Sequence, residues 1–289
     1  MKKISRRSFV KAAGSAAVLS MLAACGGSSS STAASTVSTA ASTAGASSAA
    51  AASFGPDTQA IVDRGVLKVG VKNAVQGFSF QDTLTGEYKG LEDSLAEMIA
   101  EYLGVDVEFT TVTAATRGEL LDSGDIDAVL ATFTITEERK KSWDFSTPYR
   151  TDYVGLMVKK RSGFTSIEDL DGKVIGVSQG ATTQGLIEQM IKDNGFSCKP
   201  EFRAFSGYPI IKSSLDAGNI DVFAMDRSTL AGYMNETVEL LQPEVKFGEQ
   251  GYGVATKKGC DLSAVVDQVI CDRLADGWLD QEVKTWGLV

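Results

Sequence analysis

Residues 121–132 read LDSGDIDAVLAT, and residues 215–226, 94 positions later, read LDAGNIDVFAMD. Each stretch predicts the end of a helix, a glycine in the left-handed cap conformation and then an apolar strand. A fainter echo opens each half of the chain, where VGVK at 69–72 resembles IGVS at 175–178. Two similar units predict two similar α/β lobes. The alternative is a common helix-to-strand turn that recurs without any wider symmetry.

The ends of the predicted strands carry polar residues. In open α/β sheets, ligands bind beyond the carboxyl ends of the strands. The four strand ends are Lys72, Thr132, Ser178 and Asp226. The sequence therefore predicts a ligand cleft that both lobes share. The aspartates inside the repeats, Asp127 and Asp221, are expected to be structural.

The periodicity of apolar residues predicts an α/β fold along the rest of the chain. Helices are predicted at 91–103, 113–121, 182–192 and 209–215, strands at 66–72, 105–109, 126–132, 174–177 and 220–224, and further helices near the C-terminus. Extended segments at 152–158 and 247–255 predict two paired strands that join the lobes as a hinge. The expected domains are a large lobe from 56–150 plus 252–289 and a small lobe from 154–248.

The N-terminal region has the pattern of an export signal. Residues 1–25 combine a basic start and an apolar run with Cys25, which stands where a lipoprotein signal places its lipidated (palmitate-bearing) cysteine. Arg6 and Arg7 also fit the twin-arginine export pattern, with an ordinary basic start as the alternative. Residues 26–55 are mostly Ser, Thr, Ala and Gly, which predicts a flexible tether. We therefore expect a lipid-anchored protein on the extracytoplasmic face of the cell membrane.

Composition excludes several classes of function. The net charge is −9, and it becomes −14 once the first 24 residues, with five positive charges and no negative ones, are removed. Such an acidic product is poorly suited to nucleic acid. The chain has no histidine, which excludes Ser-His and Cys-His nucleophile pairs and the usual zinc sites. We expect a monomer without a cofactor or metal, and unpaired thiols at Cys198, Cys260 and Cys271.

Residues 131–149 read ATFTITEERKKSWDFSTPY. Thr136 is placed to cap a helix whose third residue is Arg139. Free N–H groups, the positive end of the helix and a guanidinium would then surround one point, and a carboxylate suits such a point best. The alternative is that Arg139 pairs on the surface with Glu137, Glu138 or Asp144.

Segments along the whole folded part resemble the polar-amino-acid family of solute-binding proteins that serve ABC importers, most closely its aspartate/glutamate-binding branch. These segments are GVLKVGVKN (65–73), TAATRGELLDSGDIDAVLATFTITEERKK (113–141), DFSTPY (144–149), LDGKVIGVSQGATT (170–183), LDAGNIDVFAMDRS (215–228) and YGVATKKG (252–259). The resemblance implies a periplasmic-binding-protein-like (type II) fold, with two α/β lobes joined by a two-strand hinge. It also implies a permease and ATPase complex as partner.

The resemblance further implies which residues hold an acidic amino acid. Arg139 would grip the α-carboxylate, with hydrogen bonds added around Thr132, Thr134, Thr182 and Thr183. Asp226 would hold the α-ammonium group. Lys72, Arg117 and Tyr208 would hold the side-chain carboxylate. Ala74 and Gln76 depart from the pattern of the branch, so the loop after Lys72 could be shaped differently.

The charges of these residues also favour an acidic ligand. Lys72, Arg117 and Arg139 against Asp226 give a site of +2, and an unpaired buried charge costs several kcal/mol. An acidic amino acid leaves the smallest excess, which Glu92, Asp93 or another acid would offset. For Lys72 and Arg117, the alternative is a solvated surface position, and for Tyr208 it is a hydrophobic edge. The other functions considered are a receptor for glutamine or another polar amino acid, a sensory receptor and a dehydratase-like enzyme.

Overall fold

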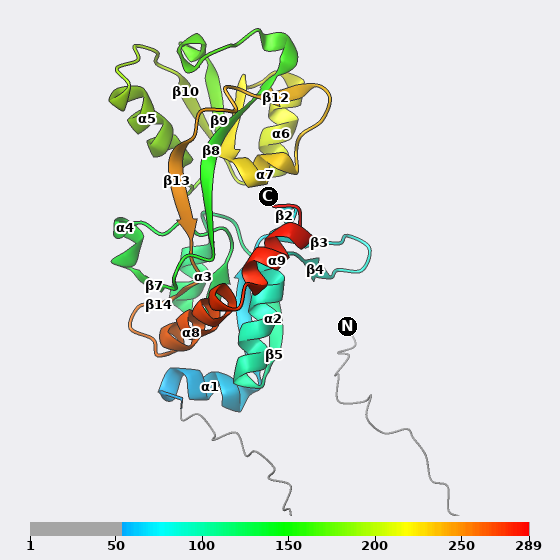
Figure 1. The fold of residues 1–289 in the computed structure, drawn as a ribbon, viewed down its shortest axis with the longest axis vertical. Helices are drawn as coiled ribbons and strands as arrows, with labels where there is room; N and C mark the ends of the chain where they lie inside the picture. The colour runs from blue at the N-terminus through cyan, green and yellow to red at the C-terminus, as the bar shows by residue number, and fades with distance from the viewer. Residues whose placement is uncertain (1–53, 289) are drawn as a thin grey trace, which may run out of the picture. The chain divides into compact units, whose positions relative to one another are not determined.

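The computed structural model describes residues 54–288 (Figure 1). The predictions for the export signal, for Cys25 and for nearly all of the tether lie outside these residues. Within residues 54–288, every helix is too short or too polar to cross a membrane.

The first lobe contains a five-stranded sheet. Its strands in spatial order are β5 (Asp106–Thr111), β1 (Val66–Val71), β6 (Ala128–Leu130), β14 (Ala255–Lys257) and β7 (Trp143–Phe145). β1 pairs in parallel with β5 and β6, whereas β14 is antiparallel to β6 and β7. The helices of this lobe are α1 (Pro56–Arg64), α2 (Leu91–Leu103), α3 (Arg117–Ser123), α4 (Glu137–Lys140), α8 (Leu262–Ala275) and α9 (Trp278–Thr285). A small sheet adds β2 (Ala74–Val75), β3 (Ser79–Gln81) and β4 (Tyr88–Lys89).

The second lobe contains a six-stranded sheet. Its main path runs β10 (Glu201–Phe205), β9 (Val174–Ser178), β11 (Val222–Asp226), β8 (Arg150–Lys159) and β12 (Val238–Leu240). β9 is parallel to β10 and β11, and β8 is antiparallel to β11. The helices are α5 (Thr183–Asp193), α6 (Tyr208–Ala217) and α7 (Arg227–Ala231), with 3-10 turns η2 (Lys160–Ser162) and η3 (Ile167–Leu170). The two sheets and their helices confirm the predicted fold of two α/β lobes.

Two adjacent strands join the lobes, as predicted. β13 (Phe247–Tyr252) pairs antiparallel with β8, and Gln250 lies opposite Asp152. The two strands run side by side between the sheets (Figure 1). The C-terminal helix α8 packs against α2 and β14 of the first lobe, so the chain returns to the lobe where it began.

The sequence repeat is a structural repeat, and the alternative of an isolated recurring turn is wrong. Gly124 and Gly218 end α3 and α6 in the left-handed conformation, at φ 80° and 82°. Asp127 then accepts a hydrogen bond from the Lys68 N–H at 2.8 Å, and Asp221 accepts one from the Val174 N–H at 2.9 Å. Both aspartates therefore tie the repeated turn to the neighbouring strand, β1 or β9, which confirms their structural role.

The weaker similarity between residues 69–72 and 175–178 also has an explanation in the packing of the core. A Cβ on Gly70 would lie 2.6 Å from Ile126 Cδ1, and a Cβ on Gly176 would lie 2.5 Å from Ile220 Cδ1. The isoleucine of each repeat thus packs on the glycine of the neighbouring strand, and a larger residue there would force the core apart.

The structure corrects one helix start and confirms the state of the cysteines. The helix predicted at 113–121 begins only at Arg117, because Thr113 and Thr116 bond each other's N–H groups through their hydroxyls at 3.0 and 3.2 Å. This local turn replaces the first helical turn. All three thiols in the described residues, Cys198, Cys260 and Cys271, are free.

Candidate functional site

Seven of the nine predicted ligand-binding residues line one small cavity between the lobes. They are Lys72, Arg117, Thr132, Thr134, Thr182, Tyr208 and Asp226, and the lining is completed by Ala114, Ala181, Met225 and Gln250. The cavity measures about 10 Å³, roughly the room that one water molecule requires. A larger ligand can therefore enter only if the lobes separate.

Lys72 follows β1 and is buried, with 5% of its surface exposed. Its ammonium group donates to the hydroxyl of Tyr208 on the other lobe and lies 4.3 Å from the centre of that ring. Burial, and then the nearby charge of Arg117, lower the pKa of Lys72 to about 7, against the opposing charges of Glu92 and Asp226. The solvated position considered for Lys72 is therefore wrong. Tyr208 lines the cavity and also packs in the hydrophobic core, as the alternative of a hydrophobic edge expected.

Arg117 is the first residue of α3 and is also buried, so a helix-surface position is wrong as well. Its Nη1 donates to the carbonyls of Ala131 at 2.5 Å and Thr132 at 3.2 Å. Its guanidinium carbon lies 3.8 Å from the centre of the Phe133 ring. Burial lowers the pKa of Arg117. This arginine both faces the cavity and holds the main chain that ends β6.

Asp226 ends β11 and presents a buried carboxylate to the cavity. It accepts hydrogen bonds from the amide nitrogen of Gln250 and from the hydroxyl of Tyr252, both on the hinge strand β13. Burial, followed by the charge of Asp152, raises the pKa of Asp226 to about 6. The Gln250 carbonyl accepts from Thr134 at 2.9 Å and from Thr182, so one hinge residue connects groups of both lobes.

Arg139 lies beside the cavity but does not line it. Thr136 caps the short helix α4 and accepts from the Arg139 N–H at 3.1 Å, as the sequence predicted. The guanidinium donates to the Thr134 carbonyl at 2.8 Å and, across the lobes, to the Gly180 carbonyl at 3.0 Å. Burial and then the charge of Arg117 lower the pKa of Arg139 to about 9.

The alternative of surface pairing for Arg139 is wrong, since the three acids proposed for it pair elsewhere. Glu137, Glu138 and Asp144 pair with Lys140, Lys141 and Lys258. Thr183, the first residue of α5, is fully buried and does not line the cavity.

Two buried carboxylates stand at the start of α2. Glu92 Oε1 accepts from the Thr132 N–H and from the Tyr149 hydroxyl, each at 2.5 Å. Asp93 Oδ1 accepts from the Ser79 hydroxyl at 2.8 Å. Burial raises the pKa of both carboxyl groups, that of Asp93 to about 8. Glu92 thus supports Thr132 of the cavity wall from behind, whereas Asp93 bonds Ser79 of β3.

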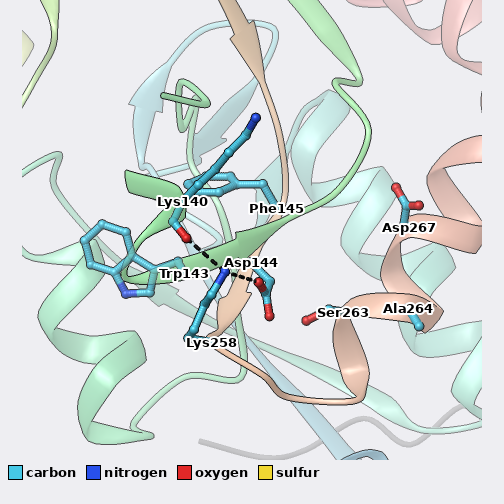
Figure 2. Close-up of a pocket in the computed structure, with 8 residues that line it drawn as sticks. All are labelled: Lys140, Trp143, Asp144, Phe145, Lys258, Ser263, Ala264 and Asp267. Carbon is cyan, nitrogen blue, oxygen red and sulfur yellow. Dashed lines mark hydrogen bonds and ion pairs between the residues drawn. The ribbon is translucent and has the colours of Figure 1, made fainter. Parts of the chain in front are cut away.

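An open pocket of about 370 Å³ lies elsewhere on the first lobe, between α4, β7 and α8 (Figure 2). Three of its charged side chains already have hydrogen-bond partners within the protein. Lys258 donates to Asp144 at 2.7 Å and to the Lys140 carbonyl at 2.9 Å, and Asp267 accepts from the Thr147 N–H at 2.6 Å. None of the nine predicted residues lines this pocket, so the interlobe cavity is the stronger candidate.

Within residues 54–288, one group of three side chains has ligand atoms close enough for a metal ion: Asp57, Cys260 and Asp261. The Asp261 carboxylate accepts from the N–H groups of Asp57 at 2.9 Å and Thr58 at 3.2 Å. It therefore caps the start of α1, and the cluster has a structural explanation.

Comparison with known proteins places the chain in a family. Residues 67–289 match the model of bacterial extracellular solute-binding proteins, family 3. The chain belongs to this family. The glutamine-binding protein GlnH of Bacillus subtilis is 32% identical over 78% of this chain and 83% of its own length. The L-cystine-binding protein TcyJ of Escherichia coli K12 is 31% identical over 78% of this chain and 84% of its own.

Solved structures support the same fold. An ancestral arginine-binding protein bound to arginine shares 33% sequence identity and a TM-score of 0.68, over 77% of this chain and 98% of its own. This similarity, together with the family match, confirms the type II periplasmic-binding-protein fold expected from the sequence. The ligands in these names carry different net charges, so kinship alone does not select one for this family member.

The hinge residues of the site and the ring beneath its arginines were not predicted from the sequence. Gln250 and Tyr252 bond Asp226, and Phe133 lies under the guanidinium groups of Arg117 and Arg139. One signal was available for the first two, because residues two apart on a strand share a face. Gln250 and Tyr252 stood on a predicted hinge strand and could have been inferred to point together into the cleft.

Asp93→Asn is expected to flatten the pH dependence of stability. Burial raises the pKa of Asp93 from 3.8 to about 8, so its contribution to stability is complete below about pH 4 and is lost as the pH rises towards 8. Between pH 5 and pH 8 the free energy of unfolding of the wild type should fall by about 4 kcal/mol relative to that of the variant. Urea unfolding at the two pH values measures this difference. Parallel losses in both proteins would show that Asp93 is ionised in the folded state.

Proposed function

We propose that this protein is the receptor of an ABC amino-acid importer and that it binds an acidic amino acid, glutamate or aspartate, between its lobes. Arg139 pairs with the α-carboxylate and Asp226 with the α-ammonium group. Lys72 and Arg117 face the side-chain carboxylate, and Tyr208 donates to it. The observation that carries the proposal is the burial of Lys72 and Arg117 at one cavity with Asp226, with Arg139 alongside.

The charges around the cavity favour an acidic ligand, and the structure identifies a candidate for the offsetting acid that the sequence left open. Glu92 is bonded to Thr132 of the cavity wall and supplies the offsetting acid. With all five groups ionised, the three cations against Asp226 and Glu92 leave +1, which the net charge of glutamate or aspartate neutralises. Glutamine would leave this charge, and arginine would raise it, in a site that the closed lobes shield from water.

The proposed cycle is a two-state equilibrium. The ligand bridges Arg139 on the first lobe and Asp226 on the second, and so favours the closed arrangement. The closed form then docks on the permease. We further propose that Cys25 carries the lipid anchor on the extracytoplasmic face, and that the protein binds its ligand without converting it.

A thermal-shift screen of the twenty amino acids at pH 6.5 tests the ligand class. Glutamate or aspartate should raise the melting temperature by several degrees, and arginine should not, because bound ligand stabilises only the folded state. The relatives that bind glutamine and cystine make a neutral polar ligand the second candidate. A larger shift with glutamine or cystine than with both acids would overturn the roles proposed for Lys72 and Arg117.

A further inference from the structure

The Thr132 turn is held in an unusual conformation by two buried charged residues. Thr132 is a non-glycine residue at φ 44°, in the left-handed region that side chains with a Cβ avoid. Its N–H donates to Glu92 at 2.5 Å, and its carbonyl accepts from Arg117 at 3.2 Å. The turn is thus fixed on both sides of one residue that lines the cavity.

Glu92 itself is fully buried, and only one of its oxygens is engaged. Oε1 accepts from Thr132 and Tyr149, whereas Oε2 has no hydrogen-bond partner among residues 54–288. A buried carboxylate with an unbonded oxygen is unfavourable unless nearby positive charge compensates it. Lys72 and Arg117 are the cations whose charges act on it. The buried carboxylate of Glu92 is therefore stabilised by these two cations as well as by its hydrogen bond to the Thr132 turn.

The other charged groups around Lys72 do not replace Glu92. Arg117 and Arg139 disfavour the protonated lysine, and Tyr208 contacts it as a neutral phenol. Asp226 favours it, but the proposed ligand ammonium takes up that carboxylate. Asp152 is bonded by the N–H groups of Tyr153 and Ser228 and does not line the cavity. Glu92 remains as the protein's own anion for Lys72 when a ligand is bound.

We propose that Glu92 is a positioning residue with two effects: it holds the Thr132 turn against the ligand, and it places a buried carboxylate beside the cavity that Thr132 and Lys72 both line, so that the cleft accepts an acidic side chain. This inference rests on the proposed function. Asp93, the next residue on α2, provides a matched control, since it is also a buried carboxylate but bonds Ser79 instead of Thr132.

Calorimetric titration with glutamate and glutamine from pH 5.5 to 8.5 tests the proposal in the wild type, Glu92→Gln, Glu92→Asp and Asp93→Asn. The ratio of the two affinities cancels effects common to both ligands, such as protonation of Asp226. In the wild type the preference for glutamate should fall with a midpoint near pH 7. In Glu92→Gln the midpoint should move down by about one pH unit or more, because a neighbouring negative charge is lost.

The other variants separate the two effects. Glu92→Asp keeps the charge but shortens the reach, so both affinities should fall about tenfold with the midpoint unchanged. Asp93→Asn should leave both affinities within about twofold of the wild type. An unchanged midpoint in Glu92→Gln would overturn the role towards Lys72, and unchanged affinities in Glu92→Asp would overturn the role towards Thr132. A wild type with no preference for glutamate at any pH would instead refute the proposed ligand.

A double variant covers the case in which Glu92→Gln does not fold. Lys72→Gln with Glu92→Gln removes both members of the pair, while Arg117 keeps its bonds to the carbonyls of Ala131 and Thr132. The double variant should then recover a cooperative thermal transition that Glu92→Gln lacks. Failure to recover it would overturn the pairing of Glu92 with Lys72.

Discussion

Arg139→Ala should weaken the binding of every amino-acid ligand by about 100- to 1000-fold. The α-carboxylate is common to all of them, and a paired guanidinium supplies two charge-assisted hydrogen bonds, together worth about 3–4 kcal/mol. The side chain is held ready for this role. Thr136 caps its helix, its Nη1 is bonded to Thr134, and its guanidinium carbon lies 4.8 Å from the centre of the Phe133 ring.

Lys140→Ala is the matched control for this experiment. Lys140 follows Arg139 on the same short helix and is half exposed, and among residues 54–288 its side chain pairs with Glu137 alone, at 2.8 Å. Its replacement should change affinity less than twofold. Calorimetric titration with glutamate, aspartate and glutamine gives the comparison. If Arg139→Ala weakened only the acidic ligands, Arg139 would be a side-chain contact and the α-carboxylate would have another partner.

The architecture was predictable because its determinants are local and occur twice. Gly124 and Gly218 end helices, and the aspartates three residues later bond the neighbouring strand. Each role depends on the residue type and on a few neighbours in the sequence. Two copies of the same pattern then indicate two lobes without any knowledge of long-range contacts.

The site was predictable only in part, because its groups depend on one another across the chain. Nothing near Gln250 in the sequence shows that its amide bonds Asp226, Thr134 and Thr182. The main-chain bonds of Arg117 depend equally on where β6 ends in space. Arg117→Ala would therefore disturb the Thr132 turn and weaken the binding of all ligands, so this variant cannot isolate the contribution of the side-chain carboxylate.

The charges of the site residues also depend on the fold, because burial shifts their pKa values. Counting Lys72 as a fixed positive charge is reasonable for a residue at a strand end, whose ordinary pKa is 10.5. In the closed cleft that pKa lies near 7, so the charge of the site depends on pH and on Glu92. A sequence shows which ionisable groups are present, but their protonation depends on how much water the fold leaves around them.

Lys72→Gln is therefore the cleaner test of acidic-ligand selectivity. At pH 6.5, glutamate should bind the variant about 30- to 800-fold more weakly, because the loss of a charge-assisted pair in a buried site costs about 2–4 kcal/mol. The affinity for glutamine should fall less than about threefold, since the neutral amide of glutamine does not require a cation as partner. The Lys72 side chain makes its hydrogen bond to Tyr208 alone among residues 54–288, so the turn at Thr132 keeps its own bonds.

Lys68→Gln provides the control for Lys72→Gln on the same strand. Lys68 lies on β1 four residues earlier and is only partly buried, and it does not line the cavity. Its replacement should leave both affinities and their ratio unchanged within about twofold. If Lys72→Gln lowered the affinities for glutamate and glutamine equally, Lys72 would support closure of the lobes through Tyr208 and would not contact the ligand side chain. A loss confined to glutamate, which disappears above pH 8 where the wild-type lysine is itself neutral, would identify the ammonium charge as the selecting group.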